Sequence, residues 1–175
     1  MKCFLFSFIN YYENLPLNWI ITSFSNIISL TSGTDLESSE YSIKNIGVPY
    51  LTGASNIQEN LEIIINRYTH ERYINSHKDE ILLTCKGTIG KIAQNTIGDI
   101  HVARQFMSIK SFINLDYTKV YLQTLVSSLN SEAKSMIPGI DRKQVLNKKI
   151  LVPPMAEQFR IVTKINQLFE IISQV

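Results

Sequence analysis

The sequence predicts an α+β fold: a compact domain with a mixed or antiparallel sheet flanked by helices, followed by a C-terminal helix of the coiled-coil type. Three observations support this prediction. Short runs rich in Ile, Leu and Val alternate with Gly and Pro turns over most of the chain. Apolar residues recur every three or four positions between about 117 and 136, and again in the last fifteen residues. Strands and helices of these lengths pack as layers around one core.

The first fourteen residues contain a short apolar run, MKCFLFSFIN, that superficially resembles a signal peptide. Tyr11, Tyr12, Glu13 and Asn14 then stand where a small-residue cleavage site would be needed. No window approaches the ~20 apolar residues that a bilayer-spanning helix requires. We therefore expect residues 1–14 to be a strand or linker that packs on the domain, and the protein to be cytoplasmic with no membrane partner.

Prolines and polar runs divide the next part of the chain. Pro16 ends the N-terminal segment, and Trp19 opens an apolar stretch that leads to a polar loop at 31–42. A short strand is predicted at 47–51, before a polar loop at 52–56. Further on, the β-branched run Ile63-Ile64-Ile65 is followed by a predicted short helical piece at about 71–76.

The middle of the chain predicts a hairpin. Residues 80–85 and 92–96 are strands on either side of a glycine-bracketed turn, KGTIGK, at 86–91. After a second turn at Gly98-Asp99, the alternation of Val102, Arg104, Phe106 and Ser108 predicts one strand within 101–112. A last short strand at 150–152 ends at Pro153-Pro154.

Two longer helices are predicted from apolar spacing. Asp116 is the expected N-cap of a helix from about Tyr117 to Met136, which Pro138-Gly139 ends. Its buried face would comprise Leu122, Leu125, Val126, Leu129, Ala133 and Met136. The final helix carries an a/d seam of Ile161, Ile165, Leu168, Ile172 and Val175. Two heptads are too few to be stable alone, and the spacing favours a partner helix and packing on the chain's own domain about equally.

Composition bounds the class of protein. A chain of 175 residues with 45% apolar and 18% charged residues suits one compact domain without long disordered tails. Cys3 and Cys85 form no CxxC pair, which indicates reduced thiols and neither a disulfide framework nor a zinc site. The net charge of +2 is uneven: two basic and five acidic residues at 1–60, seven and five at 61–115, eight and five at 116–175. A partner with phosphates would therefore favour the second and third segments.

Motifs of catalysis are absent from the sequence. It contains no GxSxG, HExxH or GxGxxG pattern and no Pro-Pro-Tyr or Pro-Pro-Trp signature of a methyltransferase. The turn at 86–91 is not a Walker loop, because only two residues separate its glycines and Ile92 follows its lysine. We expect no catalytic residue, no metal site and no cofactor, and hence no enzymatic activity in this chain alone.

A recognition surface is the remaining interpretation. Lysines on the glycine-bracketed turn can approach a phosphate closely, and Arg104 and Gln105 are side chains that make bidentate contacts to guanine and adenine. Each residue singly is more often ordinary solvated surface, but together on loops of one scaffold they favour nucleic acid. The candidate DNA-contacting residues are Thr52, Ser55, Asn56, Lys86, Thr88, Lys91, Arg104, Gln105, Arg142 and Lys143.

The run ILVPPMAEQFRIV at 150–162 resembles the end of a recognition domain in the specificity subunits of type I restriction–modification systems. There a strand meets Pro-Pro, and a Glu-Gln pair followed by Ile-Val opens a helical spacer. Earlier blocks also resemble this family, so that the similarity spans 15–175: LPLNW at 15–19, GVPY to NI at 47–57, ILLT to GTIGK at 81–91, Gln105, and a helix at 122–128. Asp79-Glu80 departs from the family's usual Gly-Asp, and the final helix is shorter than the family's spacer.

The resemblance implies a DNA target-recognition domain at 15–152, which reads one half of a bipartite target, and the start of a spacer and dimerisation helix at 153–175. The implied partners are double-stranded DNA, a methyltransferase (modification) subunit, a restriction subunit, and a second specificity chain or a second copy of this one. Methyl transfer from S-adenosylmethionine and ATP-driven translocation would belong to those subunits. The implied partner-interface residues are Pro153, Pro154, Glu157, Gln158, Ile161, Ile165, Leu168 and Ile172.

Two other interpretations stay open. The chain could be the recognition module of a fused type II restriction endonuclease–methyltransferase, which a catalytic domain in the natural reading frame would reveal. It could also be a protein-interaction scaffold that has lost DNA binding. Full-length family members carry two recognition domains and this sequence has one, so we expect either a half-subunit or a part of a longer protein.

Overall fold

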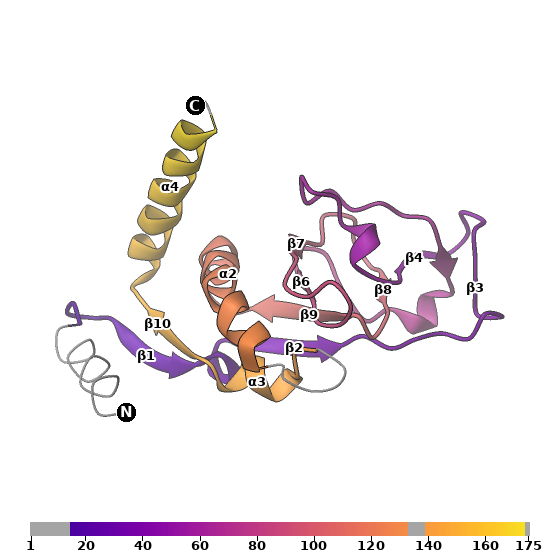
Figure 1. The fold of residues 1–175 in the computed structure, drawn as a ribbon, viewed down its shortest axis with the longest axis horizontal. Helices are drawn as coiled ribbons and strands as arrows, with labels where there is room; N and C mark the ends of the chain where they lie inside the picture. The colour runs from indigo at the N-terminus through magenta and orange to yellow at the C-terminus, as the bar shows by residue number, and fades with distance from the viewer. Residues whose placement is uncertain (1–14, 133–138, 174–175) are drawn as a thin grey trace.

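The computed structural model describes residues 15–132 and 139–173, so the expectation for residues 1–14 lies outside them. The fold is α+β, as predicted, with an antiparallel central sheet, a second, mixed sheet and a two-stranded ribbon that leads to the C-terminal helix (Figure 1). The central sheet contains, in order, β2 (Ile28–Ser32), β9 (Phe106–Ser111), β6 (Ile81–Thr84) and β7 (Ile92–Gln94). The predicted hairpin is therefore confirmed as β6 and β7.

Both faces of the central sheet are covered. Along β6, Ile81 and Leu83 point into one apolar cluster and Leu82 into another. Along β9, Phe106 and Met107 divide between the clusters in the same way. This alternation is what period-2 geometry requires of a strand with apolar neighbours on both sides. It explains why ILLT reads as a continuous apolar run rather than an alternating one.

Helix α2 (Leu115–Glu132) covers one face of this sheet. The expected N-cap, Asp116, is wrong: the Tyr117 N–H donates to Asn114 Oδ1 at 2.8 Å, so Asn114 caps the helix. Asp116 lies in the first turn and pairs with Lys119 at 2.7 Å. Leu122 and Leu129 are fully buried, as the spacing predicted, whereas the predicted positions Ala133 and Met136 lie outside the described residues.

The second sheet lies beside the other face (Figure 1). Its order is β3 (Tyr41–Ser42), β5 (Tyr68–Thr69), β4 (Val48–Leu51) and β8 (His101–Val102). The β4–β8 pair is parallel and the other two pairs are antiparallel. Strand β4 confirms the strand predicted at 47–51, and its partner β8 links this sheet through a tight turn to β9.

One strand prediction is wrong, and two other segments form less regular structure than their sequence suggests. The strand proposed through 101–112 breaks at 103–105, because β8 pairs with β4 whereas β9 pairs with β6. The run at 63–65 forms only a bridge between Ile63 and Ile57, since Ile64 bonds instead to the Asn56 loop. The helical piece at 71–76 is a single 3₁₀ turn, Glu71–Tyr73.

The chain enters and leaves the domain along one ribbon. Strand β1 (Ile20–Ser23) pairs antiparallel with β10 (Lys149–Val152), and Tyr117 Oη donates to the Leu151 carbonyl at 2.7 Å to tie α2 to the ribbon. Helix α4 (Met155–Ile172) starts directly after Pro153-Pro154 and projects away from the body (Figure 1).

Candidate nucleic-acid interface

The loop at 52–56 is organised by Asn56, which is 1% exposed. Its Oδ1 accepts from the Thr52 and Gly53 N–H groups at 2.8 and 3.2 Å, and its Nδ2 donates to the Ile64 carbonyl at 2.9 Å. A side chain so fully used inside the loop shapes the loop instead of reaching a ligand. Ser55, next to it, is exposed, and Thr52 is half-buried.

Lys91 fastens the glycine-bracketed turn to this loop. Its Nζ donates to the Ile57 carbonyl at 2.7 Å and lies 3.5 Å from the Ala54 carbonyl. The ammonium that was expected to face a phosphate is therefore engaged within the chain. Thr88, at the tip of the same turn, is exposed.

The tight turn between β8 and β9 carries Arg104 and Gln105. The Cys85 N–H donates to the Gln105 carbonyl at 2.8 Å, and the Phe106 N–H donates to the Ala103 carbonyl at 2.9 Å. The Gln105 side chain packs near Gly53, and its buried Oε1 has no hydrogen-bond partner among the residues that the structure describes. This turn therefore joins the 52–56 loop on one side to the end of β6 on the other.

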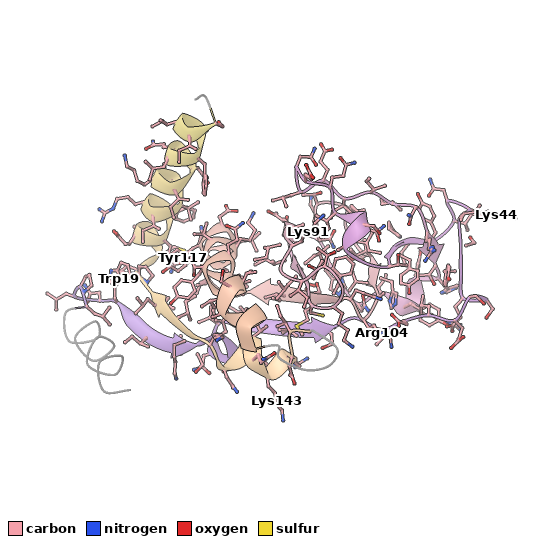
Figure 2. All side chains as sticks on the ribbon, viewed as in Figure 1. Trp19, Lys44, Lys91, Arg104, Tyr117 and Lys143 are labelled. Carbon is pink, nitrogen blue, oxygen red and sulfur yellow. The ribbon has the colours of Figure 1, made fainter. Side chains whose placement is uncertain are left out.

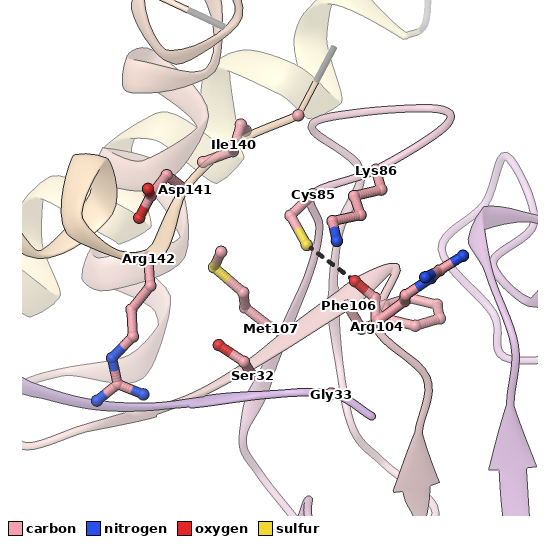
Figure 3. A pocket seen from close by; sticks show the side chains of 11 residues that line it. Ser32, Gly33, Cys85, Lys86, Arg104, Phe106, Met107, Ile140, Asp141 and Arg142 are labelled. Carbon is pink, nitrogen blue, oxygen red and sulfur yellow. Dashed lines mark hydrogen bonds between the residues drawn. The ribbon is translucent and has the colours of Figure 1, made fainter. Parts of the chain in front are cut away.

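A groove of about 350 Å³ opens beside this turn. Three predicted contact residues line it from three distant segments: Lys86 after β6, Arg104 in the β8–β9 turn, and Arg142 at the start of α3 (Arg142–Asn147). Figure 3 shows Arg142 and Lys86 on either side of Met107 and Cys85, with the Arg104 guanidinium directed away from them. All three side chains belong to exposed residues, so their charges can meet a ligand from solvent.

Helix α3 was not predicted, although its signal is present in the sequence. Asp141 accepts from the Lys143 N–H at 2.7 Å, and Gln144 Oε1 accepts from the Asp141 N–H at 2.6 Å. This reciprocal pattern is a capping box, readable as Asp-x-x-Gln before an apolar Val145. It fixes Arg142 and Lys143 at the first turn of a helix, and Figure 2 shows Lys143 at the bottom of the view.

Asp35 is a residue of this site that sequence reasoning missed. Its Oδ1 accepts from the Arg104 N–H at 3.1 Å, and its Oδ2 pairs with Arg104 Nε at 2.7 Å. The two residues lie 69 positions apart in sequence, and no local pattern connects them. The pairing of β2 with β9 and the hydrogen bond from the Thr34 N–H to the Val102 carbonyl bring their segments together.

The thiol of Cys85 in the groove is structural. Burial raises its pKa above the ordinary value, and the nearby Lys86 charge opposes this only in part. Its Sγ lies 3.4 and 3.6 Å from the Gln105 and Arg104 carbonyls, to which the protonated thiol donates (Figure 3). A neutral, buried thiol is a poor nucleophile, so Cys85 supports the turn.

Of the first four expected partner-interface residues, two are buried and two are at least partly exposed. Pro153 and Gln158 are buried within the domain, and Gln158 Oε1 accepts from the Asn114 N–H at 3.0 Å while its Nε2 donates to the Pro153 carbonyl at 2.8 Å. Pro154 is exposed at the N-cap of α4, and Glu157 forms an ion pair with Arg160.

The apolar seam of α4 is also divided. Ile161 and Ile165 are half-buried against the domain, whereas Leu168 is 48% and Ile172 67% exposed. The first half of the helix thus packs on its own chain and the second half presents apolar side chains to solvent. Spacing alone left these two arrangements open: packing on the chain's own domain is confirmed for the first half, and a partner helix stays a prediction for the second.

Within residues 15–132 and 139–173, no group of three His, Cys, Asp or Glu side chains could hold a metal ion. No helix in the described part of the chain is long and apolar enough to cross a membrane.

Three solved structures share this fold. One is described as showing complex assembly and conformational transition of a type I R-M system, with a TM-score of 0.81 at 19% identity over 92% of this chain. The HsdS subunit of Thermoanaerobacter tengcongensis has a TM-score of 0.78, also at 19% identity and 92% coverage. The type I S subunit of M. genitalium has a TM-score of 0.62 at 16% identity over 90% of this chain.

In each case the match covers 40% of the other chain, so this chain spans less than half the length of those proteins. Among the curated proteins compared with it, none is significantly similar. The type I restriction modification DNA specificity domain matches residues 16–174, nearly the whole sequence, and this chain therefore belongs to that family.

Proposed function

We propose that this chain recognises one half of a bipartite DNA target for a type I restriction–modification system. The observation that carries the proposal is the family match over residues 16–174, on a chain whose basic residues converge on one groove. In this proposal residues 15–152 are the recognition domain, and 153–175 begin a helix that joins it to a partner. Of the fused-enzyme and scaffold interpretations, no feature of the structure favours the first, and the second becomes an outcome of the test below.

The groove has the electrostatics that a DNA backbone requires. The structure records no ion pair for Lys86 or Arg142 within its described residues, whereas Arg104 is neutralised by Asp35. Lys86 and Arg142 share this opening with Asp141, and cations without an ion-pair partner suit phosphate oxygens; Lys143, next to Arg142 in sequence, is also exposed. The side chains of Thr88 and Ser55 extend this surface along the neighbouring loops.

Asn56 and Lys91 have a different role in the proposal. Their polar atoms are used within the chain, so they hold the 52–56 loop and the 86–91 turn in place. They support the recognition surface without contacting DNA themselves. Thr52 bonds to Asn56 in the 52–56 loop, and Gln105 packs near Gly53 of the same loop, where its Oε1 is an unused acceptor among the described residues.

The second half of α4 is the proposed contact to another specificity chain or to a second copy of this one. Leu168 and Ile172 are exposed on the side of the a/d seam, and apolar side chains at this spacing pack against a partner helix. Methyl transfer, translocation and cleavage are then the work of the modification and restriction subunits, which this chain would direct to the target.

The test is to co-express the chain with the methyltransferase subunit encoded beside it and to map adenine methylation in the host DNA. A palindromic bipartite motif supports recognition by two copies of this chain. An asymmetric motif supports a second specificity chain that reads the other half. No new methylation, together with retained binding of the methyltransferase subunit, refutes DNA recognition and favours the scaffold.

A direct binding assay tests the groove. Arg142→Ala should weaken binding to all duplexes and lower the salt slope by about 1, as loss of one phosphate contact does. Lys78→Ala is the matched control, because Lys78 is also exposed but precedes β6 whereas the groove lies at the end of that strand. Equal salt slopes for the two variants would remove Arg142 from the interface.

A further inference from the structure

We propose that Arg104 reads a guanine in the DNA target and that Asp35 is the positioning residue that aims its guanidinium. This inference rests on the proposed DNA-recognition function and names one base of the target. It is carried by the geometry of the Asp35–Arg104 pair at the edge of the basic groove.

The backbone of Arg104 is held from several directions. The Ala103 N–H donates to the Leu51 carbonyl at 2.9 Å, and the Gly33 N–H donates to the Phe106 carbonyl at 3.0 Å. The Cys85 thiol donates to the Arg104 carbonyl itself. Side chains that read bases need such a fixed origin, since small displacements lose both hydrogen bonds of a bidentate contact.

Asp35 is fixed in the same way. The preceding Thr34 donates its N–H to the Val102 carbonyl at 3.1 Å, and its own carbonyl lies 2.8 Å from Nε2 of the buried His101. From this position the Asp35 carboxylate takes both the main-chain N–H and the Nε of Arg104. The carboxylate therefore restrains the long side chain as well as the turn that carries it.

The Arg104 nitrogens that Asp35 does not engage are the donors that a guanine needs. With Nε engaged by Asp35, the Nη1 and Nη2 groups have no recorded partner within the described residues, and the Arg104 side chain is 64% exposed. Guanine presents two acceptors, O6 and N7, on its major-groove edge, and the guanidinium fork matches them with two parallel hydrogen bonds. An adenine at the same place would put an N6 amino donor against one of these donors.

Charge distinguishes this role from a phosphate contact. The Asp35 carboxylate cancels the Arg104 charge at 2.7 Å and would itself face an approaching phosphate. A neutral base edge needs aimed donors instead of net charge, so the pair suits a base better than the backbone. Lys86 and Arg142, on the same groove, lack such a carboxylate partner among the described residues and suit phosphates.

An ordinary surface ion pair is the rival explanation, and it predicts different results. Exposed pairs of this kind contribute little to stability and nothing to specificity. The decisive readout is therefore the recognised sequence, which a merely stabilising pair cannot change.

The experiment maps methylated motifs for the full chain expressed with its methyltransferase subunit, in six forms: wild type, Arg104→Ala, Arg104→Lys, Asp35→Ala, the Asp35→Ala/Arg104→Ala double variant and Arg142→Ala. The wild-type motif should contain a guanine at which Arg104→Ala loses discrimination by roughly 5- to 150-fold, the range of one bidentate base contact. Lysine keeps the charge and can still donate to guanine but lacks the planar fork, so Arg104→Lys should retain part of this discrimination and shows whether the loss in Arg104→Ala is a loss of folding. Arg142→Ala should lower methylation of every site and leave the motif unchanged.

The positioning role of Asp35 is tested by comparing its variant with the Arg104 variants at the same base of the motif. Asp35→Ala should relax the same position as Arg104→Ala, and the double variant should relax it no further, because a positioning residue has no effect once its target is gone. An Arg104→Ala variant that keeps the full wild-type motif refutes the assignment, as does an equal weakening of all sequences in both Arg104 variants. A wild-type complex that methylates no motif refutes the proposed function itself, and the assignment falls with it.

Discussion

Removal of the Gln158 side chain should destabilise the domain strongly, although the residue lies in a helix that looks like an interface element from its sequence. Gln158 is 2% exposed and joins the first turn of α4 to two other parts of the chain. Its Oε1 accepts from the Asn114 N–H at 3.0 Å, beside the start of α2, and its Nε2 donates to the Pro153 carbonyl at 2.8 Å. Gln158→Ala therefore leaves a buried donor and a buried acceptor without partners.

The expected cost follows from these two groups. Each buried group left unpaired costs about 1–3 kcal/mol, so the loss of two partners in Gln158→Ala should lower the free energy of unfolding by roughly 2–6 kcal/mol. Gln158→Glu separates the two bonds, since it keeps an acceptor for Asn114 but places an oxygen against the Pro153 carbonyl. The free energy of unfolding that Gln158→Glu loses should come mainly from the lost hydrogen bond to the Pro153 carbonyl.

Urea unfolding at one fixed protein concentration measures these differences, because any self-association would otherwise shift the apparent stability. Glu157→Gln is the matched control: it adjoins Gln158 but loses only an ion pair with the exposed Arg160, worth about 0.5 kcal/mol or less. If Gln158→Ala costs no more than this control, the two hydrogen bonds do not hold α4 to the domain.

Three further outcomes are expected. Asn56→Ala should lower the free energy of unfolding by about 2–4 kcal/mol, because backbone groups of the 52–56 loop lose their partners, and Asn56→Asp, which keeps the acceptor, should cost less in the same urea assay. In a Cys3→Ser background the buried Cys85 thiol, whose pKa burial raises, should react with a disulfide reagent at pH 8 at least about tenfold more slowly than in urea, and equal rates would contradict its burial. The hydrogen bond from Tyr73 holds the pKa of Glu40 below its ordinary value of 4.5, so its contribution to stability is complete above that value and is lost as the pH falls through the lower folded pKa. Glu40→Gln should therefore flatten the acid limb of unfolding free energy against pH, and parallel limbs would show that this bond is not made.

The elements that could be predicted are those that local chemistry determines. The β6–β7 hairpin follows from two apolar runs on either side of a glycine turn, and the buried face of α2 follows from the three-four spacing of Leu122 and Leu129. Prediction failed where long-range pairing decides. The strand at 101–112 breaks because β8 and β9 pair with different strands, and their own sequence carries little trace of that division.

For the candidate site, too, the sequence predicted residue types but not long-range contacts. Residue type and loop position brought Lys86, Arg104 and Arg142 into the prediction, and the fold places all three on one groove. Residue type cannot show that Lys91 is used by the Ile57 carbonyl or that Asp35 meets Arg104 from 69 residues away. These partners come from tertiary structure, so the roles of supporting and contacting residues separate only there.

The β1–β10 ribbon has a consequence for how such a domain is inherited. Because Ile20 lies opposite Val152 in an antiparallel pair, the chain before β1 and the helix after β10 leave the domain at the same point. Everything between the two strands is a closed excursion from that point, so its replacement by another sequence would leave the flanking segments in register. Recombination within the short stretches that encode the ribbon would then exchange one target preference for another while α4 and its neighbours keep their geometry. A restriction system could in this way acquire a new specificity in a single genetic event.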